Sequence, residues 1–356
     1  MERGFLGTLP LGDERDDDSY LDFVEGVRVF TQTQVAAKVR EVIPDKLTEF
    51  EQRTGRKPQT IADARAALDP VPVVASRNRL MRSSQEMMWR QVVETYRKRE
   101  KELLAELDRY DRLGPGSVEY DPNFQYPDYY ARVEFHIQPG NYHADPLAGY
   151  IYHYGTKVFY TGRNNHDDVQ REWVNLAPVP ADGKVARILD QACSAGQSTT
   201  ALKERFPQAE VWGIDIAAPM VRYAHKRAVD MGLEVHFAQR AAEDTKFPDN
   251  WFDLVYSRIF FHEIPLTAAE QVIRETYRIL RPGGLYVIVD FANRPPGLSS
   301  PVDDYFRDFD THDNGEPYAS DFVYSDFLGM LRRAGFRIVS ENATPQLYQP
   351  MRVCAK

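Results

Sequence analysis

Cysteine is scarce in this chain of 356 residues, which contains only Cys193 and Cys354. Two cysteines can form at most one disulfide bond, which is too few to stabilise the fold of a chain of this length. Their spacing matches no zinc-binding pattern either, so neither a disulfide framework nor a metal site is predicted. The same scarcity favours a reducing compartment, and we therefore expect the cytoplasm.

Long apolar runs and a surplus of basic residues are missing as well. No segment has the roughly 18 consecutive apolar residues of a membrane span. The N-terminal stretch lacks the apolar core of a secretory signal and is too acidic for a mitochondrial transit peptide. The formal net charge of −9 argues against DNA or RNA, because binding phosphates needs clustered Lys and Arg. A small-molecule partner fits this composition.

The length predicts two domains, and the sequence pattern changes along the chain. Within residues 77–112 apolar side chains recur at helical spacing between charged faces, which predicts one long helix. Its apolar stripe requires either a partner helix in the same chain or a second copy, so a homodimer is one of two alternatives. We divide the chain into an acidic arm (1–30), a helical region with possible dimerisation (31–113), a Tyr-rich connector or substrate cap (114–182) and a C-terminal domain (183–356).

The connector is rich in aromatic residues: nine of the 20 tyrosines lie between Tyr120 and Tyr160. Tyrosine presents a flat apolar face and a polar tip, which suits the wall of a pocket for an aromatic ligand. The alternative is that these rings only pack the connector against the C-terminal domain. His143, His153 and Tyr154 are candidate proton acceptors from this segment.

From Val185 onward short apolar strands alternate with helical segments, which predicts a parallel α/β sheet covered on both faces. The last two strands have no helix between them, so one of them should run antiparallel. The first strand ends at Asp190 and leads into the turn Gln191–Gly196, at the edge of the sheet where ligands of such folds bind.

This turn has a single glycine, Gly196, where nucleotide-binding turns usually have three. Ala192 and Ser194 keep the space small but do not tolerate positive φ freely, so the backbone there must avoid that region or bear strain. Asp215 ends the second strand and is placed to bind a ribose diol. The acid Asp190 before the turn, with no basic residue in it, disfavours a pyrophosphate and favours the cationic S-adenosylmethionine.

Four segments in order, "ILDQACSAGQST", "VWGIDIAAPMV", "AAEDTKFPDNWFDLVYS" and "RILRPGGLYVIVD", make residues 183–356 resemble the class I S-adenosylmethionine-dependent methyltransferases, in particular the small-molecule ubiquinone/menaquinone type. The resemblance covers about half of the chain. It implies a Rossmann-like α/β fold with a seven-stranded sheet in the order 3-2-1-4-5-7-6, strand 7 being antiparallel.

The resemblance also implies roles for individual residues. The methionine end of the cofactor would lie on the first turn, the sugar on Asp215, and the adenine between Ile216 and the segment after the third strand. The residues implied as cofactor-binding are Asp190, Ala192, Cys193, Ser194, Gly196, Asp215, Ile216, Ala242, Glu243 and Ser257. Cys193 also has a purely structural interpretation, as a small residue packed beneath the cofactor. The aspartate expected at the adenine amine is replaced by Ala241, so Glu243 or backbone would take its place.

Methyl transfer depends on alignment of donor and acceptor, and a hydroxyl acceptor also needs a base to take its proton. His262 and Glu263 follow the fourth strand in "YSRIFFHEIP", where O-methyltransferases of plant type have a histidine base. His262 is therefore predicted as the base, with a pocket-wall role and a structural role as alternatives. His153 and Tyr154 are rival candidates.

The predicted function is S-adenosylmethionine-dependent O-methylation of a small aromatic or apolar hydroxyl compound. Methylation of sulfur, nitrogen or carbon is an alternative, and a non-methylating catalyst or scaffold that binds S-adenosylmethionine is an alternative of another class.

Residues 292–321 interrupt the α/β pattern. They form either a lid, with Tyr305, Phe306 and Phe309 facing the substrate, or a surface loop.

Overall fold

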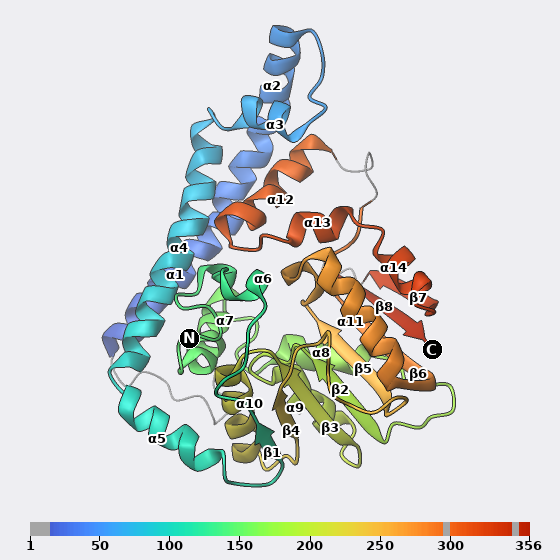
Figure 1. Ribbon diagram of the computed structural model, residues 1–356. Helices are drawn as coiled ribbons and strands as arrows, with labels where there is room; N and C mark the ends of the chain where they lie inside the picture. The colour runs from blue at the N-terminus through green and yellow to red at the C-terminus, as the bar shows by residue number, and fades with distance from the viewer. Residues whose placement is uncertain (1–14, 295–299, 344–348) are drawn as a thin grey trace.

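One mixed sheet organises the computed structural model, which describes residues 15–294, 300–343 and 349–356 (Figure 1). Its strands are β1 Ser117–Glu119, β2 Arg187–Gln191, β3 Glu210–Asp215, β4 His236–Gln239, β5 Phe252–Arg258, β6 Leu280–Val289, β7 Arg337–Ala343 and β8 Pro350–Ala355. Their order across the sheet is β1-β4-β3-β2-β5-β6-β8-β7. Neighbouring strands are parallel except for β8, which is antiparallel to both β6 and β7.

From β4 to β7 this order is the predicted 3-2-1-4-5-7-6, with the predicted antiparallel strand, so the Rossmann-like fold class is confirmed. The eighth strand, β1, comes from the connector and extends the sheet beside β4. The amide of Ser117 donates to the carbonyl of Val235 at 3.2 Å. Gly116 has φ +87°, and a Cβ there would lie 2.0 Å from that same carbonyl oxygen, so only glycine allows this close approach.

Two helical layers cover the sheet, as expected for strands that are apolar on both faces. The cluster on one face joins the strands to α8 Asp168–Leu176, α9 Gln197–Arg205 and α10 Ala218–Asp230. The cluster on the other face joins them to α11 Leu266–Ile279, α13 Ala319–Tyr324 and α14 Phe327–Arg333. The last residues of β2, β3 and β5 meet at one edge between these layers, so this edge is the place where the fold positions a site.

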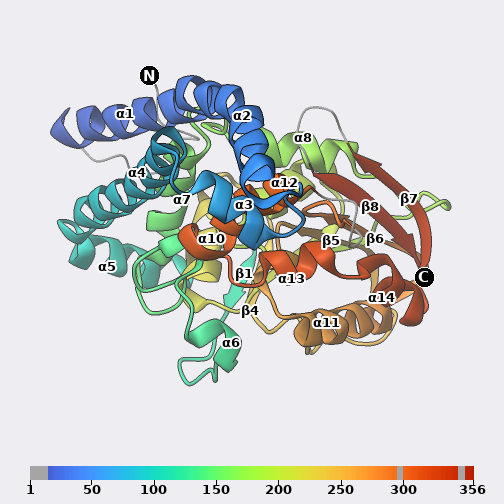
Figure 2. The ribbon, with the colours of Figure 1, turned by 90° about the horizontal axis from the view of Figure 1, so that it is seen from above.

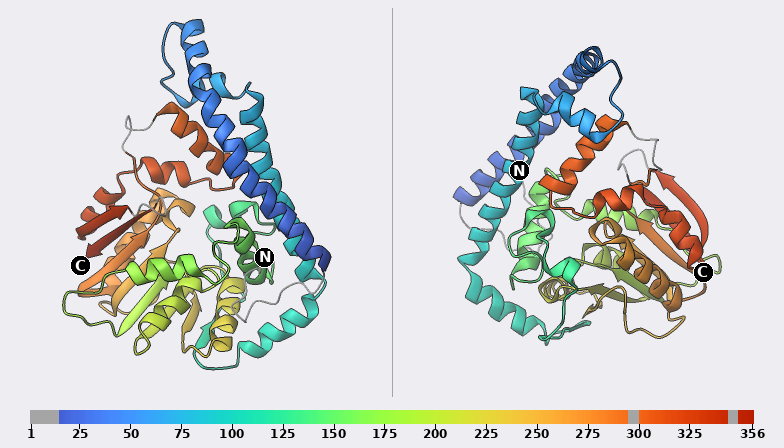
Figure 3. Two further views of the ribbon diagram at one scale, coloured as in Figure 1. Left: turned by 180° about the vertical axis from the view of Figure 1, so that it is seen from behind. Right: turned by 45° about the horizontal axis from the view of Figure 1, so that its top comes forward.

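The N-terminal region is helical from its first described residue. α1 Arg15–Phe30 continues through a π-helical turn, Thr31–Val35, into α2 Ala36–Thr54 (Figure 3, left). Residues 15–30, expected as part of an acidic arm, therefore form a helix. Leu21 and Val24 explain this, because they lie one turn apart and are fully buried against α4.

α3 Ile61–Leu68, α4 Pro72–Arg97 and α5 Glu100–Tyr110 follow. The prediction of one helix over 77–112 is wrong at Arg99, whose φ of −115° and ψ of 14° end α4 and redirect the chain. This bend lets Leu103 and Leu107 of α5 join the same buried cluster as Tyr223 of α10. The stripe Met88, Val92 and Tyr96 is buried in that cluster beside α1 and α7, so its partner lies within the chain (Figure 2).

The connector supplies α6 Asp128–Ala131, the 3₁₀ turn Phe135–Ile137 and α7 Ala148–Phe159. α7 lies between α4 and α10, and two glycines bring the backbones close. A Cβ on Gly155 would lie 2.2 Å from the Trp89 ring, and one on Gly149 would lie 2.3 Å from the Cβ of Tyr223. The connector is therefore packed into the body of the molecule.

Beyond the sheet, α12 Pro301–Asp313 packs against α3. Among the helices of the described residues, none has both the length and the apolar character of a membrane-spanning segment.

Candidate functional site

A cavity of about 330 Å³ opens at the carboxyl ends of β2, β3 and β5. Its floor is formed by the loops after these strands, and its opposite wall by the Tyr-rich connector and the segment after α12. The connector contributes the rings Tyr129, Tyr130, Phe135, Tyr142, Tyr152, Phe159 and Tyr160. Of the two interpretations of the tyrosine cluster, the pocket wall is therefore realised for these residues.

Most of the predicted site residues lie along this one cavity. The lining includes Asp190, Ala192, Cys193, Ser194, Asp215, Ile216, Ala242, Glu243, His262 and Glu263. Five predicted residues are not part of it: Gly196, Ser257, His143, His153 and Tyr154. Gly196 is the N-cap of α9, and Ser257 is buried in β5, where its hydroxyl lies 3.4 Å from that of Tyr286.

The sequence left two alternatives for the glycine-poor turn after β2: its backbone either avoids positive φ or is strained. The structure shows the strained form. Ala192 has φ +56° and Ser194 has φ +51°, both in the left-handed region. The amide of Cys193 donates to Ile214 at 2.9 Å, and the amide of Ser194 donates to Asp215 Oδ2 at 2.9 Å. Gly196 has φ +72° and packs so tightly that an added Cβ would lie 2.8 Å from Ala224. Glycine is thus kept where both the angle and the space require it.

Two carboxylates form the floor of the cavity. Burial raises the pKa of Asp190 to about 7, with the charge of Asp215 adding to the shift, while a 2.6 Å hydrogen bond from Thr199 opposes it. Burial raises the pKa of Asp215 to about 6, although backbone amides of Ala217 and Ser194 donate to it. A ligand that brings positive charge or hydrogen-bond donors would satisfy both groups.

Glu243 lies farther along the same edge and accepts a hydrogen bond from Tyr129 of the connector. Burial is the largest cause of the raised pKa of the Tyr129 phenol, and the Glu243 carboxylate adds to it. The connector is thereby tied to the predicted adenine side of the site.

His262 lines the cavity and belongs to a fully buried pair. Its Nδ1 lies 2.6 Å from Asp290 Oδ1, and its ring stacks on Phe291 with the centroids 4.1 Å apart. Asp290 Oδ2 also accepts from the amides of Phe260 and Phe261, at 3.0 and 2.7 Å. Burial alone would lower the pKa of His262, but the Asp290 charge overrides it and raises the pKa to about 9.

The other ring nitrogen of His262, Nε2, is buried and has no hydrogen-bond partner among the described residues. Because His262 lines the cavity and Asp290 fixes the ring through Nδ1, Nε2 is the nitrogen left for a ligand. Asp290 thus orients the histidine and also holds the loop that carries it.

His136 joins three segments across the top of the cavity. Its Nε2 lies 3.0 Å from Glu263 Oε1, and its Nδ1 lies 3.2 Å from Glu316 Oε1. Burial would lower the pKa of His136, but these two carboxylates outweigh it and the pKa is raised. Glu263 is therefore occupied by an ion pair that connects the loop after β5 to the connector.

His153 and Tyr154, the rival candidates from the connector, are fully buried away from the cavity lining. His153 contacts Tyr223 through Nδ1 at 2.6 Å and Asp167 through Nε2 at 3.4 Å. Burial lowers the pKa of His153 to about 4, so its ring is neutral near neutral pH. Tyr154 is packed in the cluster shared by α1, α4 and α7. Neither side chain is placed to reach a ligand in this cavity.

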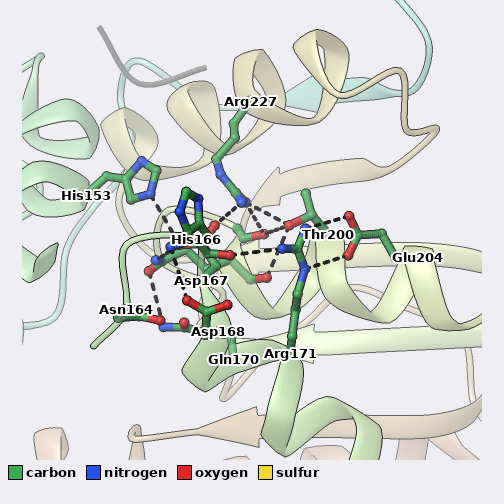
Figure 4. A network of polar contacts seen from close by, with 12 residues as sticks. His153, Asn164, His166, Asp167, Asp168, Gln170, Arg171, Thr200, Glu204 and Arg227 are labelled. Atoms are coloured by element: carbon green, nitrogen blue, oxygen red, sulfur yellow. Dashed lines mark hydrogen bonds and ion pairs between the residues drawn. The ribbon is translucent and has the colours of Figure 1, made fainter. Parts of the chain in front are cut away.

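Asp167 is the centre of a buried polar network between the connector and the C-terminal domain (Figure 4). Its carboxylate accepts from Lys157 Nζ at 2.6 Å and from Arg227 and Gln197. Arg227 also donates to the carbonyl of Gly196 at 3.1 Å. One side chain from the connector therefore holds both the binding turn and the first residue of α9.

The insertion after β6 contributes to the cavity through different residues from those predicted. Tyr305 and Phe306 lie in the cluster with α2 and α3, where the Tyr305 hydroxyl donates to Asp69 at 2.8 Å. Asn314 and Glu316, just after α12, line the cavity instead. The aromatic residues of the insertion thus serve packing, and its polar residues reach the site.

Sequence reasoning missed Asp290, His136, Arg258 and Asp167. Asp290 had a signal, because it directly follows the apolar run "LYVIV" of β6 at the ligand edge of the sheet. Asp167 and His136 had none beyond their residue types, because their roles depend on how the connector folds back on the C-terminal domain.

Comparisons with known proteins agree with this architecture. The family described as "Methyltransferase domain" matches residues 188–284. A demethylmenaquinone methyltransferase of Thermus thermophilus is 41% identical over 31% of this chain and 50% of its own length. Phosphoethanolamine N-methyltransferase 1 of Arabidopsis thaliana is 30% identical over 47% of this chain and 32% of its own length. The chain thus spans half or less of these two relatives.

A third relative is matched over most of its length. It is an uncharacterized methyltransferase of Synechocystis, 30% identical over 47% of this chain and 73% of its own length. Together with the strand order and the residues of the first turn, these matches identify the chain as a member of the class I S-adenosylmethionine-dependent methyltransferases.

Proposed function

We propose that the protein transfers a methyl group from S-adenosylmethionine to a small molecule with an aromatic or apolar body, and that the acceptor atom is a hydroxyl oxygen. The single observation that carries the proposal is the position of His262. His262 lines an aromatic-lined cavity, its Nε2 is buried and lacks a partner among the described residues, and Asp290 fixes the other nitrogen.

The residues at the floor of the cavity fit the cofactor by their chemistry. Asp190 and Asp215 are buried carboxylates with raised pKa values, and each would be stabilised by a ligand that brings positive charge or hydroxyl donors. We assign Asp215 to the ribose, Asp190 to the ammonium end, and Ile216, Ala242 and Glu243 to the adenine. The cofactor supplies an electrophilic methyl group on its sulfonium.

The chain's own task is then to align the acceptor and receive its proton. The connector rings would hold the acceptor's flat body and exclude water. In its neutral form His262 accepts the hydroxyl proton at Nε2, and the resulting imidazolium is stabilised by Asp290 at 2.6 Å. We therefore assign His262 as the base and Asp290 as its positioning residue, with Glu263 acting through its ion pair to His136.

A second candidate is methylation of nitrogen or carbon. Its support is the pKa of about 9 for His262, which leaves the imidazole protonated at neutral pH before any ligand binds. The Arabidopsis relative is named as an N-methyltransferase, and the Thermus relative as a methyltransferase of demethylmenaquinone. With such an acceptor, His262 would be a hydrogen-bond donor in the pocket wall.

The pH dependence of the rate tests the two candidates. Phenols, phosphoethanolamine and a demethylated quinone are supplied with methyl-labelled S-adenosylmethionine, and kcat/KM of any methylated product is followed over about pH 6 to 10. With a hydroxyl acceptor the rate rises with pH up to an apparent pKa of about 9 or below, because only neutral His262 accepts a proton.

Replacement His262→Gln should then remove this rise and lower kcat/KM by about 10²- to 10⁴-fold. A variant that keeps the wild-type profile contradicts the assignment of His262 as the base. Asp290→Asn is the companion variant, because it leaves the ring in place and removes the charge that raises its pKa; the rise should move to lower pH.

A cytoplasmic location and a homodimer remain predictions from the sequence. The apolar stripe on which the dimer prediction rested is buried within the chain, so a dimer would have to form through another surface. Light scattering of the purified protein distinguishes a monomer from a dimer.

A further inference from the structure

Two tyrosines of the connector line the cavity and have buried hydroxyl groups. Tyr130 belongs to α6 and Tyr142 to the loop before α7, and they are only 8% and 7% exposed. Neither hydroxyl has a hydrogen-bond partner among the described residues. Because a buried polar group without a partner is costly, each hydroxyl needs a partner that this part of the chain does not supply.

Packing holds both tyrosine rings in place. The ring centroid of Phe135 lies 5.7 Å from that of Tyr130 and 6.2 Å from that of Tyr142, on which it stacks. The side-chain amide of Asn141 donates to the carbonyl of Tyr130 at 3.2 Å, which connects the two segments that carry the tyrosines. The positions of the two rings are therefore set by the fold before any ligand binds.

The backbone between the two tyrosines is strained. His136, Ile137 and Asn141 have φ of +53°, +53° and +52°, and such values are rare above all for a β-branched residue such as Ile137. Strained backbone persists where the surroundings impose it, and it concentrates at ligand sites. The strain thus supports a ligand-binding role for this segment.

Both phenols are kept protonated by their surroundings. Burial raises the pKa of Tyr130 well above its ordinary value, and the carboxylates of Asp215 and Glu263 add to the shift. Burial does the same to the pKa of Tyr142, with Glu263 and Glu316 adding to the shift. A protonated phenol donates a hydrogen bond, so an oxygen atom that accepts one is the partner that both side chains require.

An uncharged oxygen suits these donors better than a charged group. Glu263 and Glu316 both contact His136, at 3.0 and 3.2 Å, so that two carboxylates share one imidazolium. The excess of negative charge disfavours a carboxylate or a phosphate nearby. A cationic group would have to compete with His136 for the same two carboxylates.

Tyr142 lies in the same part of the cavity as His262. The charges of Glu263 and Glu316 act on the imidazole of His262 as well as on the phenol of Tyr142. A ligand oxygen bound by Tyr142 would therefore belong to the molecule that meets His262.

We propose that Tyr130 and Tyr142 determine specificity by donating hydrogen bonds to a second, uncharged oxygen of the acceptor, such as a ketone oxygen. The inference rests on the proposed function, because it takes the acceptor to be a hydroxyl compound bound in this cavity. Both tyrosines lie outside residues 188–284, the part of the chain that matches the methyltransferase family. They belong to the connector, which supplies the aromatic wall of the cavity.

The test is calorimetric binding to the full chain, with and without S-adenosylhomocysteine, so that no methyl group is transferred. The probes are 3- and 4-hydroxyacetophenone and the matching ethylphenols, in which a methylene group replaces the carbonyl. The corresponding hydroxybenzoates and hydroxybenzylamines add a negative or a positive charge at the same ring positions. The wild type should bind one hydroxyacetophenone about tenfold more tightly than its ethylphenol, and more tightly than the charged compounds.

Tyr130→Phe and Tyr142→Phe remove only the hydroxyl groups. Each should lower the affinity for that hydroxyacetophenone about 2- to 10-fold and leave the affinities for the ethylphenol and for S-adenosylhomocysteine unchanged. Neither variant should lower the melting temperature of the ligand-free protein, because no hydrogen bond within the described residues is lost. A purely structural role would give the opposite pattern, a lower melting temperature with unchanged selectivity.

Tyr256→Phe is the matched control. Tyr256 of β5 is fully buried and its hydroxyl also has no partner among the described residues, but it is not part of the cavity lining. Its replacement should leave the affinities for all probes unchanged.

The proposal is overturned if the wild type does not prefer a hydroxyacetophenone to its ethylphenol, if it prefers a charged compound, or if both phenylalanine variants keep the wild-type preference. A variant that weakens S-adenosylhomocysteine instead would assign that hydroxyl to the cofactor and overturn its role toward the acceptor. Failure of the wild type to bind S-adenosylhomocysteine at all would reject the proposed function, while the selectivity among the other probes could still be measured, so the two failures are distinguishable.

Discussion

At the scale of single residues, the charge state of the cavity floor depends on pH close to neutrality. Asp190 has a pKa raised to about 7 by burial, and Asp215 one raised to about 6. The sequence placed both carboxylates at the ends of their strands, because strand ends and turns can be recognised from apolar runs. It could not give their pKa values, since the burial comes partly from connector rings that fold over them.

Affinity for the cofactor should consequently rise with pH. A ligand with an ammonium group favours the ionised form of Asp190. When the pH is below the pKa of about 7 that Asp190 has in the free protein, binding must release the proton of Asp190; when the pH is above this pKa, Asp190 is already ionised and no proton is released from it. We expect S-adenosylhomocysteine, which keeps the ammonium group, to bind about tenfold more tightly at about pH 8 than at about pH 5.5. Calorimetry in buffers of different ionisation enthalpy measures both affinity and proton release.

Asp190→Asn is the control for this dependence. The amide cannot ionise, so the variant should bind weakly at both pH values, and the proton release that remains should be that of Asp215, whose pKa is about 6. Equal affinity of the wild type at both pH values would show that Asp190 does not meet the ligand's charge.

At the scale of elements, the turn between β2 and α9 illustrates how far sequence patterns reach. The position of the turn was predicted, but the choice between avoiding positive φ and bearing strain was not, because it depends on how the loop meets Ile214 and Asp215. The break of the predicted 77–112 helix at Arg99 likewise follows from the packing of α5 against α10, which no local propensity encodes.

Relief of the strain in that turn should stabilise the protein. Ala192 and Ser194 have φ of +56° and +51°, a region that costs a non-glycine residue about 1 kcal/mol. Ala192→Gly and Ser194→Gly are each expected to raise the free energy of unfolding by up to about 1 kcal/mol, less the entropy that glycine adds to the unfolded chain.

Ala195→Gly is the matched control, because Ala195 is fully buried and is not among the positive-φ residues. This variant should lower the free energy of unfolding. Denaturant unfolding at constant pH measures all three; a loss in every variant would contradict strain at 192 and 194.

The close contact of α7 with α4 offers a second prediction at this scale. A Cβ at Gly155 would lie 2.2 Å from the Trp89 ring, whose Nε1 donates to the carbonyl of His136 at 2.7 Å. Gly155→Ala should cost about 1–3 kcal/mol by overpacking, and should also weaken ligand binding, because displacement of Trp89 moves His136. Gly26 is an exposed residue of α1, and a Cβ added there would meet nothing within 4 Å, so Gly26→Ala should gain up to about 1 kcal/mol. Equal thermal shifts in the two variants would contradict the packing argument.

At the scale of the whole molecule, the boundary predicted near residue 183 is crossed by many buried interactions. Asp167 lies before it and Arg227 after it, and their ion pair is buried. Tyr223 of α10 lies in one cluster with residues of α1, α4, α5 and α7. The division into a helical part, a connector and a C-terminal domain was a reasonable interpretation of composition, but composition cannot report how tightly such parts pack.

The C-terminal part should therefore not be stable by itself. A fragment of residues 183–356 would expose the apolar surface around Tyr223, lose β1 from the sheet edge and leave Arg227 without its carboxylate partner Asp167. The full chain should unfold in one cooperative calorimetric transition, whereas the fragment should lack a cooperative transition or have a far lower melting temperature.

The fragment carrying Arg227→Met separates the two causes of instability, because this change removes the unpaired charge but not the exposed apolar surface. If the unmodified fragment melts within a few degrees of the full chain, the connector is a removable cap, and residues 183–356 contain everything that the fold of the site requires.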